Sequence, residues 1–142
     1  MSDTLILRGS DDFISIEVVP NWSDPQGNGD VYVLISVSSS GYSGKNDLWV
    51  DGEALRSFVV QLADLNQSLK GKATLQSMSP GELELTIQSV SSRGHLAVSG
   101  STGYQVLGEN SSWWHSVTFG FEFEQSQLQE AIKRSWLNSY IC

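Results

Sequence analysis

The two histidines are the leading candidates in this chain for acid–base chemistry. His95 follows Gly94 at the start of a predicted strand, and His115 stands between Trp113 and Val117 in an alternating apolar segment. A histidine that acts as a general base needs a nucleophile within hydrogen-bond reach, and no G-x-S-x-G segment supplies one. Because a polar group on an apolar face normally finds a buried partner, we interpret His115 as a satisfied core residue.

Two pairs of carboxylates have a spacing that could also support catalysis. Glu82 with Glu84, and Glu122 with Glu124, are two residues apart, which on a strand puts both members of a pair on one face. Glycosidases use two carboxylates across a cleft. Acids on the polar face of a strand are, however, equally typical of a solvated outer surface, and we predict that surface for both pairs.

Metal and phosphate sites need denser clusters than this chain offers. Residues 24–30 carry oxygen ligands of the kind that calcium prefers, but they lack the EF-hand spacing and its closing Glu. Residues 99–103 are rich in Ser and Gly without the spacing of a phosphate-binding loop. Cys142 is the only cysteine and has no basic neighbour in sequence to activate its thiol. We therefore predict no metal, no cofactor and no enzymatic activity.

Exposed aromatic side chains are the remaining candidates for a functional role. Trp22 lies in a polar loop, and Trp114 is on the polar face of a predicted strand together with Glu122 and Glu124. Tryptophan is enriched at the centres of protein interfaces, and neighbouring acids favour a basic partner. These four residues form the candidate partner-binding surface. The alternative is that one of the helices covers Trp114.

The opposite face of the same strand supplies a second candidate site. Trp113, His115, Phe119 and Phe121 alternate along it. Ligand pockets are mostly apolar with a few polar groups. A small molecule held on a curved sheet by these residues is therefore the alternative to protein binding.

Apolar periodicity predicts the elements that would position these side chains. Strands are expected at residues 5–8, 13–19, 31–37, 48–50, 72–76, 83–87, 95–100 and 113–124. Residues 103–110 are expected to form a loop because they are rich in Gly and polar residues. One apolar stripe from Leu55 to Leu69, behind an N-cap at Asp51, predicts a helix. A second amphipathic helix is expected over residues 128–136.

The order ββββαββββα predicts an α+β fold. Strands in runs, rather than in alternation with helices, favour antiparallel pairing, and we expect a mostly antiparallel, curved β-sheet of about 7–8 strands with two helices. The length of 142 residues fits a single domain spanning residues 1–142.

The charge balance restricts the partners. Sixteen acidic residues face eight basic ones, for a net charge of −8. Such a surface repels phosphate backbones, so no nucleic-acid binding is expected, although an acidic excess is also typical of plain solubility. The chain lacks the roughly 20-residue apolar stretch of a membrane span and the basic start of a signal peptide. We expect a cytoplasmic protein with no membrane partner.

The pattern as a whole resembles the WapI-type immunity protein family and related small bacterial domains. The segments that carry the resemblance are Phe13–Val18, Leu55–Leu62, Leu83–Ile87, Gly94–Val98 and Phe119–Leu128. The resemblance implies a protein that binds and blocks a toxin domain made by its own cell, and it implies no catalytic residues. The sequence therefore predicts a non-enzymatic protein-binding domain, with a basic toxin domain or another protein as its partner.

Overall fold

The computed structural model of the chain describes residues 4–19 and 29–141, with three helices and eight strands. Trp22 and most of residues 24–30 lie outside this part. The strands are β1 (Thr4–Arg8), β2 (Phe13–Val18), β3 (Val31–Ser39), β4 (Tyr42–Val50), β5 (Lys72–Gln76), β6 (Leu83–Ser89), β7 (His95–Leu107) and β8 (Ser112–Glu124). The helices are α1 (Gly52–Ser68), α2 (Gln125–Arg134) and α3 (Leu137–Ile141). The predicted α+β class and the order of elements are confirmed.

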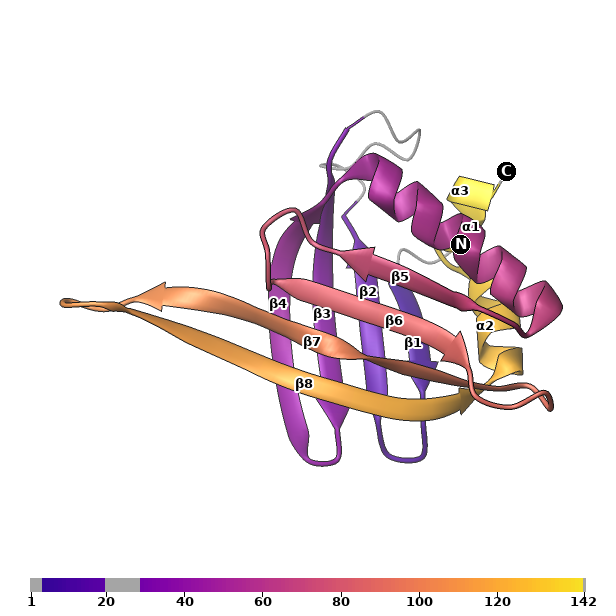
Figure 1. Cartoon of the computed structure of the whole chain (residues 1–142). Coiled ribbons are helices and arrows are strands. Elements are labelled where there is room, and N and C mark those ends of the chain that lie inside the picture. Colours follow the sequence, from indigo (N-terminus) through magenta and orange to yellow (C-terminus); the bar gives the residue numbers. More distant parts are fainter. Residues whose placement is uncertain (1–3, 20–28, 142) are drawn as a thin grey trace.

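The strands form two antiparallel sheets of four, in the orders β1-β2-β3-β4 and β5-β6-β7-β8. The division differs from the single curved sheet expected, because α1 carries the chain from the end of β4 into a second layer. Figure 1 shows the strands of the second sheet running across those of the first. Each sheet is a simple meander, so neighbouring strands in sequence are neighbours in space.

The core lies between the two sheets and beneath the helices. Alternate residues of each strand point inward, as in β3, where every second residue from Val31 to Ser39 is buried. Helix α1 closes one end of the core with its buried apolar stripe, and it begins where Asp51 Oδ2 accepts a hydrogen bond of 3.2 Å from the Ala54 N–H. The second helix ends at Arg134, before Trp136, because a short turn leads into α3. Trp136 is buried and donates to the Ile16 carbonyl at 2.9 Å.

The last two strands are much longer than the rest of their sheet. The pairing of β6 with β7 ends at Leu83 and Thr102, whereas β7 and β8 stay paired out to Leu107 and Ser112. The two strands therefore leave the body as a two-stranded ribbon, which Figure 1 shows projecting beyond β4. We call residues 103–116 the arm. The loop expected over residues 103–110 is wrong, because most of this segment continues β7.

One side chain of the first sheet fixes the base of the arm. Asn46 of β4 donates from its Nδ2 to Thr102 Oγ1 at 3.0 Å and to the Gly103 carbonyl at 2.9 Å. Thr102 is buried, and its hydroxyl donates in turn to the Glu82 carbonyl at 2.6 Å. Next to this network a Cβ on Gly44 would lie 2.9 Å from Val117 Cγ1, so only glycine allows β4 to pack this closely on β8.

Candidate functional site

The arm is the part of the described chain where large apolar side chains gather in solvent. Directly opposed residues share a face, so the register places Tyr104, Val106, Trp113 and His115 on the face that continues the core, called the inner face of the arm. Leu107 and Trp114 lie on the outer face. Trp113 is 62% exposed and Leu107 84% exposed. Exposed apolar side chains that gather in one place are a recognised mark of an interaction site.

Glycines under the tryptophans give the arm its shape. A Cβ on Gly103 would lie 3.0 Å from the Trp114 ring, and one on Gly81, in the turn between β5 and β6, would lie 3.2 Å from it. A Cβ on Gly108 would lie 3.1 Å from Trp113 Nε1. Each ring therefore covers backbone that has no side chain of its own, as aromatic residues do beside glycines in strands. None of the three described helices covers Trp114, which remains half exposed.

A shallow pocket lies where the inner face of the arm meets β4, and we call it the corner pocket. It has a volume of about 160 Å³. Tyr104 and His115 form part of one wall, with their ring centroids 6.1 Å apart. The facing wall is the stretch of β4 from Ser43 to Asn46. Ligand pockets usually have volumes of roughly 300–1,000 Å³, so the corner pocket is small for a metabolite.

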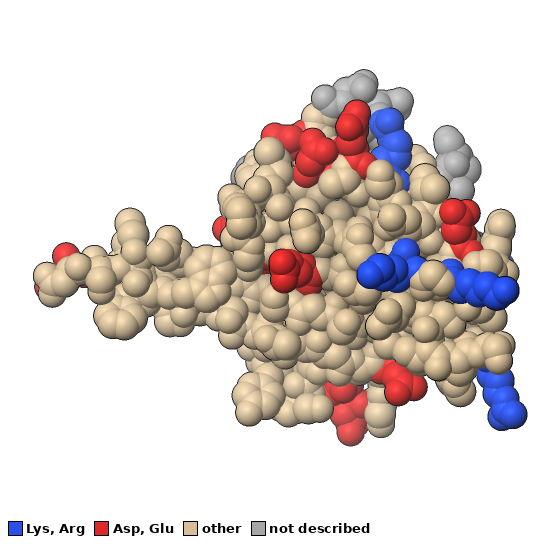
Figure 2. Space-filling model, in the orientation of Figure 1, with Lys and Arg blue, Asp and Glu red and all other residues tan. Residues whose placement is uncertain are grey.

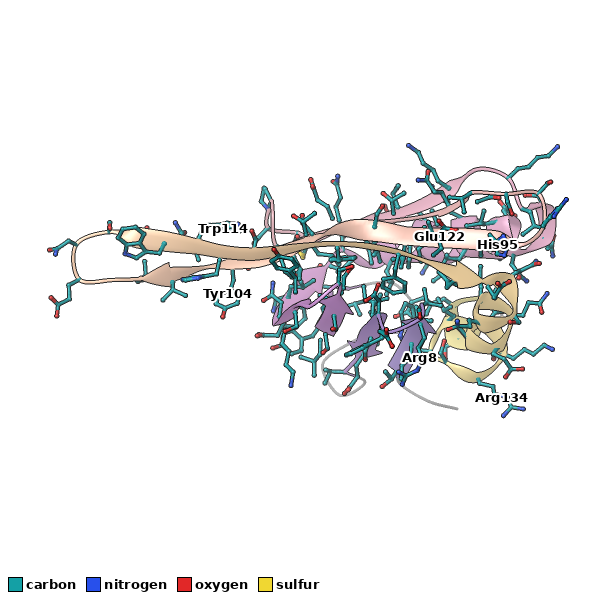
Figure 3. The ribbon with its side chains drawn as sticks, turned by 90° about the horizontal axis from the view of Figure 1, so that it is seen from below. Arg8, His95, Tyr104, Trp114, Glu122 and Arg134 are labelled. Atoms are coloured by element: carbon teal, nitrogen blue, oxygen red, sulfur yellow. The ribbon has the colours of Figure 1, made fainter. Side chains whose placement is uncertain are left out.

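Charge is distributed unevenly along the molecule. Glu109, at the tip, is the only Asp, Glu, Lys or Arg among residues 103–116. Figure 2 shows the projecting arm almost free of charged side chains and Lys and Arg gathered toward the opposite end of this face. Figure 3 places Arg8 and Arg134 at that end too, far from Tyr104 and Trp114. The arm is therefore a nearly uncharged projection on an acidic protein. On the face shown in Figure 2 the cations lie mostly at the end remote from the arm, while Lys45 lines the corner pocket beside it.

The structure spreads the predicted partner-binding surface along β8. Trp114, Glu122 and Glu124 do share one face of the strand, but Trp114 is eight residues from Glu122, which corresponds to about 26 Å. Figure 3 shows Trp114 on the arm and Glu122 over the body. Trp22, the fourth member, lies outside the described residues. On the arm, Trp114 shares the outer face with Leu107, and Trp113 lies on the inner face.

The predicted ligand pocket is divided in a similar way. Phe119 is buried in the core, and Phe121 is partly buried against Gly9, whose Cβ would meet its ring at 2.9 Å. Trp113 and His115 are exposed on the arm. The interpretation of His115 as a core residue is wrong, because β8 leaves the core at Val117 and the first sheet does not extend below the strand from there on. His115 lines the corner pocket, while Trp113, Phe119 and Phe121 do not.

His95 takes part in an arrangement that superficially resembles a hydrolytic triad. Its Nδ1 lies 3.2 Å from Ser91 Oγ, and its Nε2 lies 3.2 Å from Glu124 Oε1. The His95 and Glu124 side chains are 45% and 65% exposed, whereas the acid of a hydrolytic triad is buried against its histidine. Ser91 Oγ also accepts from the Arg93 N–H at 3.2 Å. These contacts tie the β6–β7 turn to the end of β8.

Two features of the surface were missed by sequence reasoning. The first is the group of exposed residues Tyr104, Val106 and Leu107, which lie in the segment predicted to be a loop. Tyr32 and Trp49 make a tilted ring contact on the outer face of the first sheet, with centroids 5.0 Å apart, and the Tyr32 hydroxyl donates to Asp47. This hydrogen bond, with the carboxylate's charge and some desolvation, raises the pKa of Tyr32. The alternation of apolar and polar residues in β3 and β4 could have identified this aromatic pair, because it assigns Tyr32 and Trp49 to the face that does not point into the core.

The described residues offer little for metal or membrane binding. Among residues 4–19 and 29–141, no three His, Cys, Asp or Glu side chains come close enough together to hold a metal ion. None of the described helices has the length and apolar character needed to cross a membrane.

Comparison with known proteins gives one match. The family model described as the immunity protein WapI-like family matches residues 5–134, nearly the whole chain. The search of curated proteins and the search of solved structures return no match. The matched region includes both sheets, the arm and α2.

Proposed function

Because the chain belongs to the WapI-like immunity protein family, we propose that it neutralises a cognate toxin by binding the toxin domain through the arm. The observation that carries this proposal is the set of exposed apolar side chains on the arm, above all Trp113 and Leu107. A protein that binds and blocks its partner needs a contact surface and no reactive groups. The arm supplies such a surface.

The composition of the arm suits a protein partner. Trp and Tyr are enriched among the residues that dominate binding energy, and charged residues are depleted at the centres of interfaces. The arm carries Tyr104, Trp113 and Trp114 within one ribbon and only one charged carboxylate, Glu109. A projecting ribbon can also enter a concave site on a partner, where both of its faces would be buried.

The charge of the whole chain favours a basic toxin domain. A net charge of −8 attracts a basic partner over distances of the order of the Debye length, about 10 Å at 0.1 M salt. Because the cations on the face shown in Figure 2 lie mostly toward the end remote from the arm, a basic partner would be repelled from that end and would approach with the arm foremost. The encounter would take place in the cytoplasm, where the toxin domain would act on the cell that makes it.

Co-production tests the proposal. We expect the toxin domain to be encoded by the gene next to this chain's gene. Production of that domain alone should arrest growth of a sensitive host, and co-production of the chain should restore growth. The purified proteins should then form a 1:1 complex on size exclusion. Growth arrest that persists although the chain is produced and folded, together with no complex, would contradict the proposal.

A further inference from the structure

The edge of β4 beside the arm has backbone groups with no partner among the described residues. On an antiparallel strand, alternate residues direct both N–H and C=O toward the same side. The Trp49 carbonyl accepts a hydrogen bond from the Met78 N–H at 2.9 Å. The backbone N–H and C=O groups of Trp49, and of every second residue from it along β4, are therefore directed away from β3. Asp47 N–H is satisfied by Asn46 Oδ1 at 2.9 Å. Ser43 and Lys45 continue this parity, and within the described chain no hydrogen bond engages their outward groups.

These free groups open into the corner pocket, below the arm. The second sheet extends beyond the first by the length of the arm. Its inner face therefore continues past β4, over a space that no described strand of the first sheet occupies. Tyr104 and His115 line that space at the pocket, and Val106 and Trp113 follow farther out on the same face. Among the described residues, β4 is the last strand of the first sheet on the side where the arm projects.

We propose that an extended segment of the toxin domain pairs with residues 42–46 of β4 and fills this missing position beneath the arm. The proposal rests on the proposed function, since it names the part of the toxin that the site takes. Neighbouring strands lie about 4.8 Å apart, so the added strand would lie along the wall formed by Ser43, Gly44 and Lys45. The N–H and C=O groups of Ser43 and Lys45 would give it main-chain hydrogen bonds, as in other cases of strand addition.

The surroundings define the chemistry of that segment. Side chains on one of its faces would point at Tyr104 and His115, so that face should be apolar or aromatic. Side chains on the other face would lie level with Lys45 and Asp47 at the solvent side of the first sheet, so that face should be polar. An extended segment with this alternation, and without proline at the positions facing Ser43 and Lys45, is the occupant that fits.

A pair of substitutions at one position tests the strand addition. Lys45→Pro removes the outward N–H and leaves the pairing with β3 in place, as proline does on edge strands. Lys45→Ala removes the same side-chain charge and keeps the N–H, so it is the matched control. Titration against the purified toxin domain of the neighbouring gene should show Lys45→Pro weakened by about 10- to 100-fold. Lys45→Ala should stay within about 3-fold of the wild-type chain.

The possible outcomes separate the inference from the proposed function. Wild-type chain that does not bind the toxin domain overturns both. Normal binding by wild type, Lys45→Ala and a folded Lys45→Pro variant overturns the strand addition alone; thermal unfolding by circular dichroism verifies that the variant is folded. Light scattering on the free chain tests a second copy as the occupant. A wild-type dimer that Lys45→Pro converts to monomer would assign the β4 edge to self-association and overturn the inference.

Discussion

Shortening the arm is expected to abolish neutralisation while leaving the domain folded. Removing residues 105–114 and joining Tyr104 to His115 through Asn-Gly keeps the opposed pair at the base and replaces the tip with a favoured two-residue turn. The deletion takes away Val106, Leu107, Trp113 and Trp114, all of them large side chains at least 42% exposed. We expect affinity for the toxin domain to fall by at least about 1,000-fold, since two or three interface hot spots of about 2 kcal/mol each are lost.

The stability of the shortened chain separates binding from folding. The deleted side chains are not part of the core cluster, so the midpoint of thermal unfolding should change by no more than about 4 °C, the effect of roughly 1 kcal/mol in a domain of this size. Trp49→Ala is the control, because Trp49 is an exposed tryptophan on the outer face of the first sheet and outside the arm. This variant should bind the toxin domain within about 3-fold of wild type. Equal affinities of the shortened and intact chains would contradict the proposed role of the arm.

Gly100→Ala should strongly destabilise the domain. Gly100 pairs with Leu85 and Phe119 in the middle of the second sheet, at a φ of +153° that side chains rarely adopt. A Cβ there would lie 1.9 Å from the Glu84 carbonyl oxygen, so β6 and β7 would have to separate. We expect a loss of at least about 3 kcal/mol in the free energy of unfolding, measured by urea titration.

The neighbouring strand provides a matched control for this substitution. Gly120 lies on β8, and a Cβ there would meet Ser99 Cβ at 3.6 Å, an ordinary van der Waals distance. Gly120→Ala should change the free energy of unfolding by no more than about 1 kcal/mol. Equal free energies of unfolding for Gly100→Ala and Gly120→Ala would contradict the close approach of β6 and β7 at Gly100.

Much of the fold was predictable because the periodicity of the sequence reflects burial directly. The alternation in β2, β3 and β6 identified strands and their inward residues, and the stripe behind Asp51 identified α1 with its N-cap. The division into two sheets was not predictable in this way. Periodicity reports which face of a strand is buried, but it does not report which strands share a layer.

The candidate site was predicted only in part, for reasons that lie in the arm itself. Considered with their sequence neighbours alone, Gly103 and Gly108 favour a loop. Strand β7 nevertheless continues past Gly103, because Trp114 of the opposite strand covers this glycine. His115 continues the apolar alternation of β8, but its burial depends on how far the first sheet extends below it. The extent of the first sheet is set by the strand order, in which β4 is the last strand. No local sequence pattern reports that order.

Amide hydrogen exchange of the chain, free and bound to the toxin domain, tests most directly whether the arm is the binding surface. Binding is expected to slow exchange most strongly in residues 103–116, while the exposed side of α1 and the β6–β7 turn exchange at unchanged rates. Slowed exchange confined to α1 or the outer face of the first sheet, with the arm exchanging as in the free protein, would contradict the assignment of the arm as the binding surface.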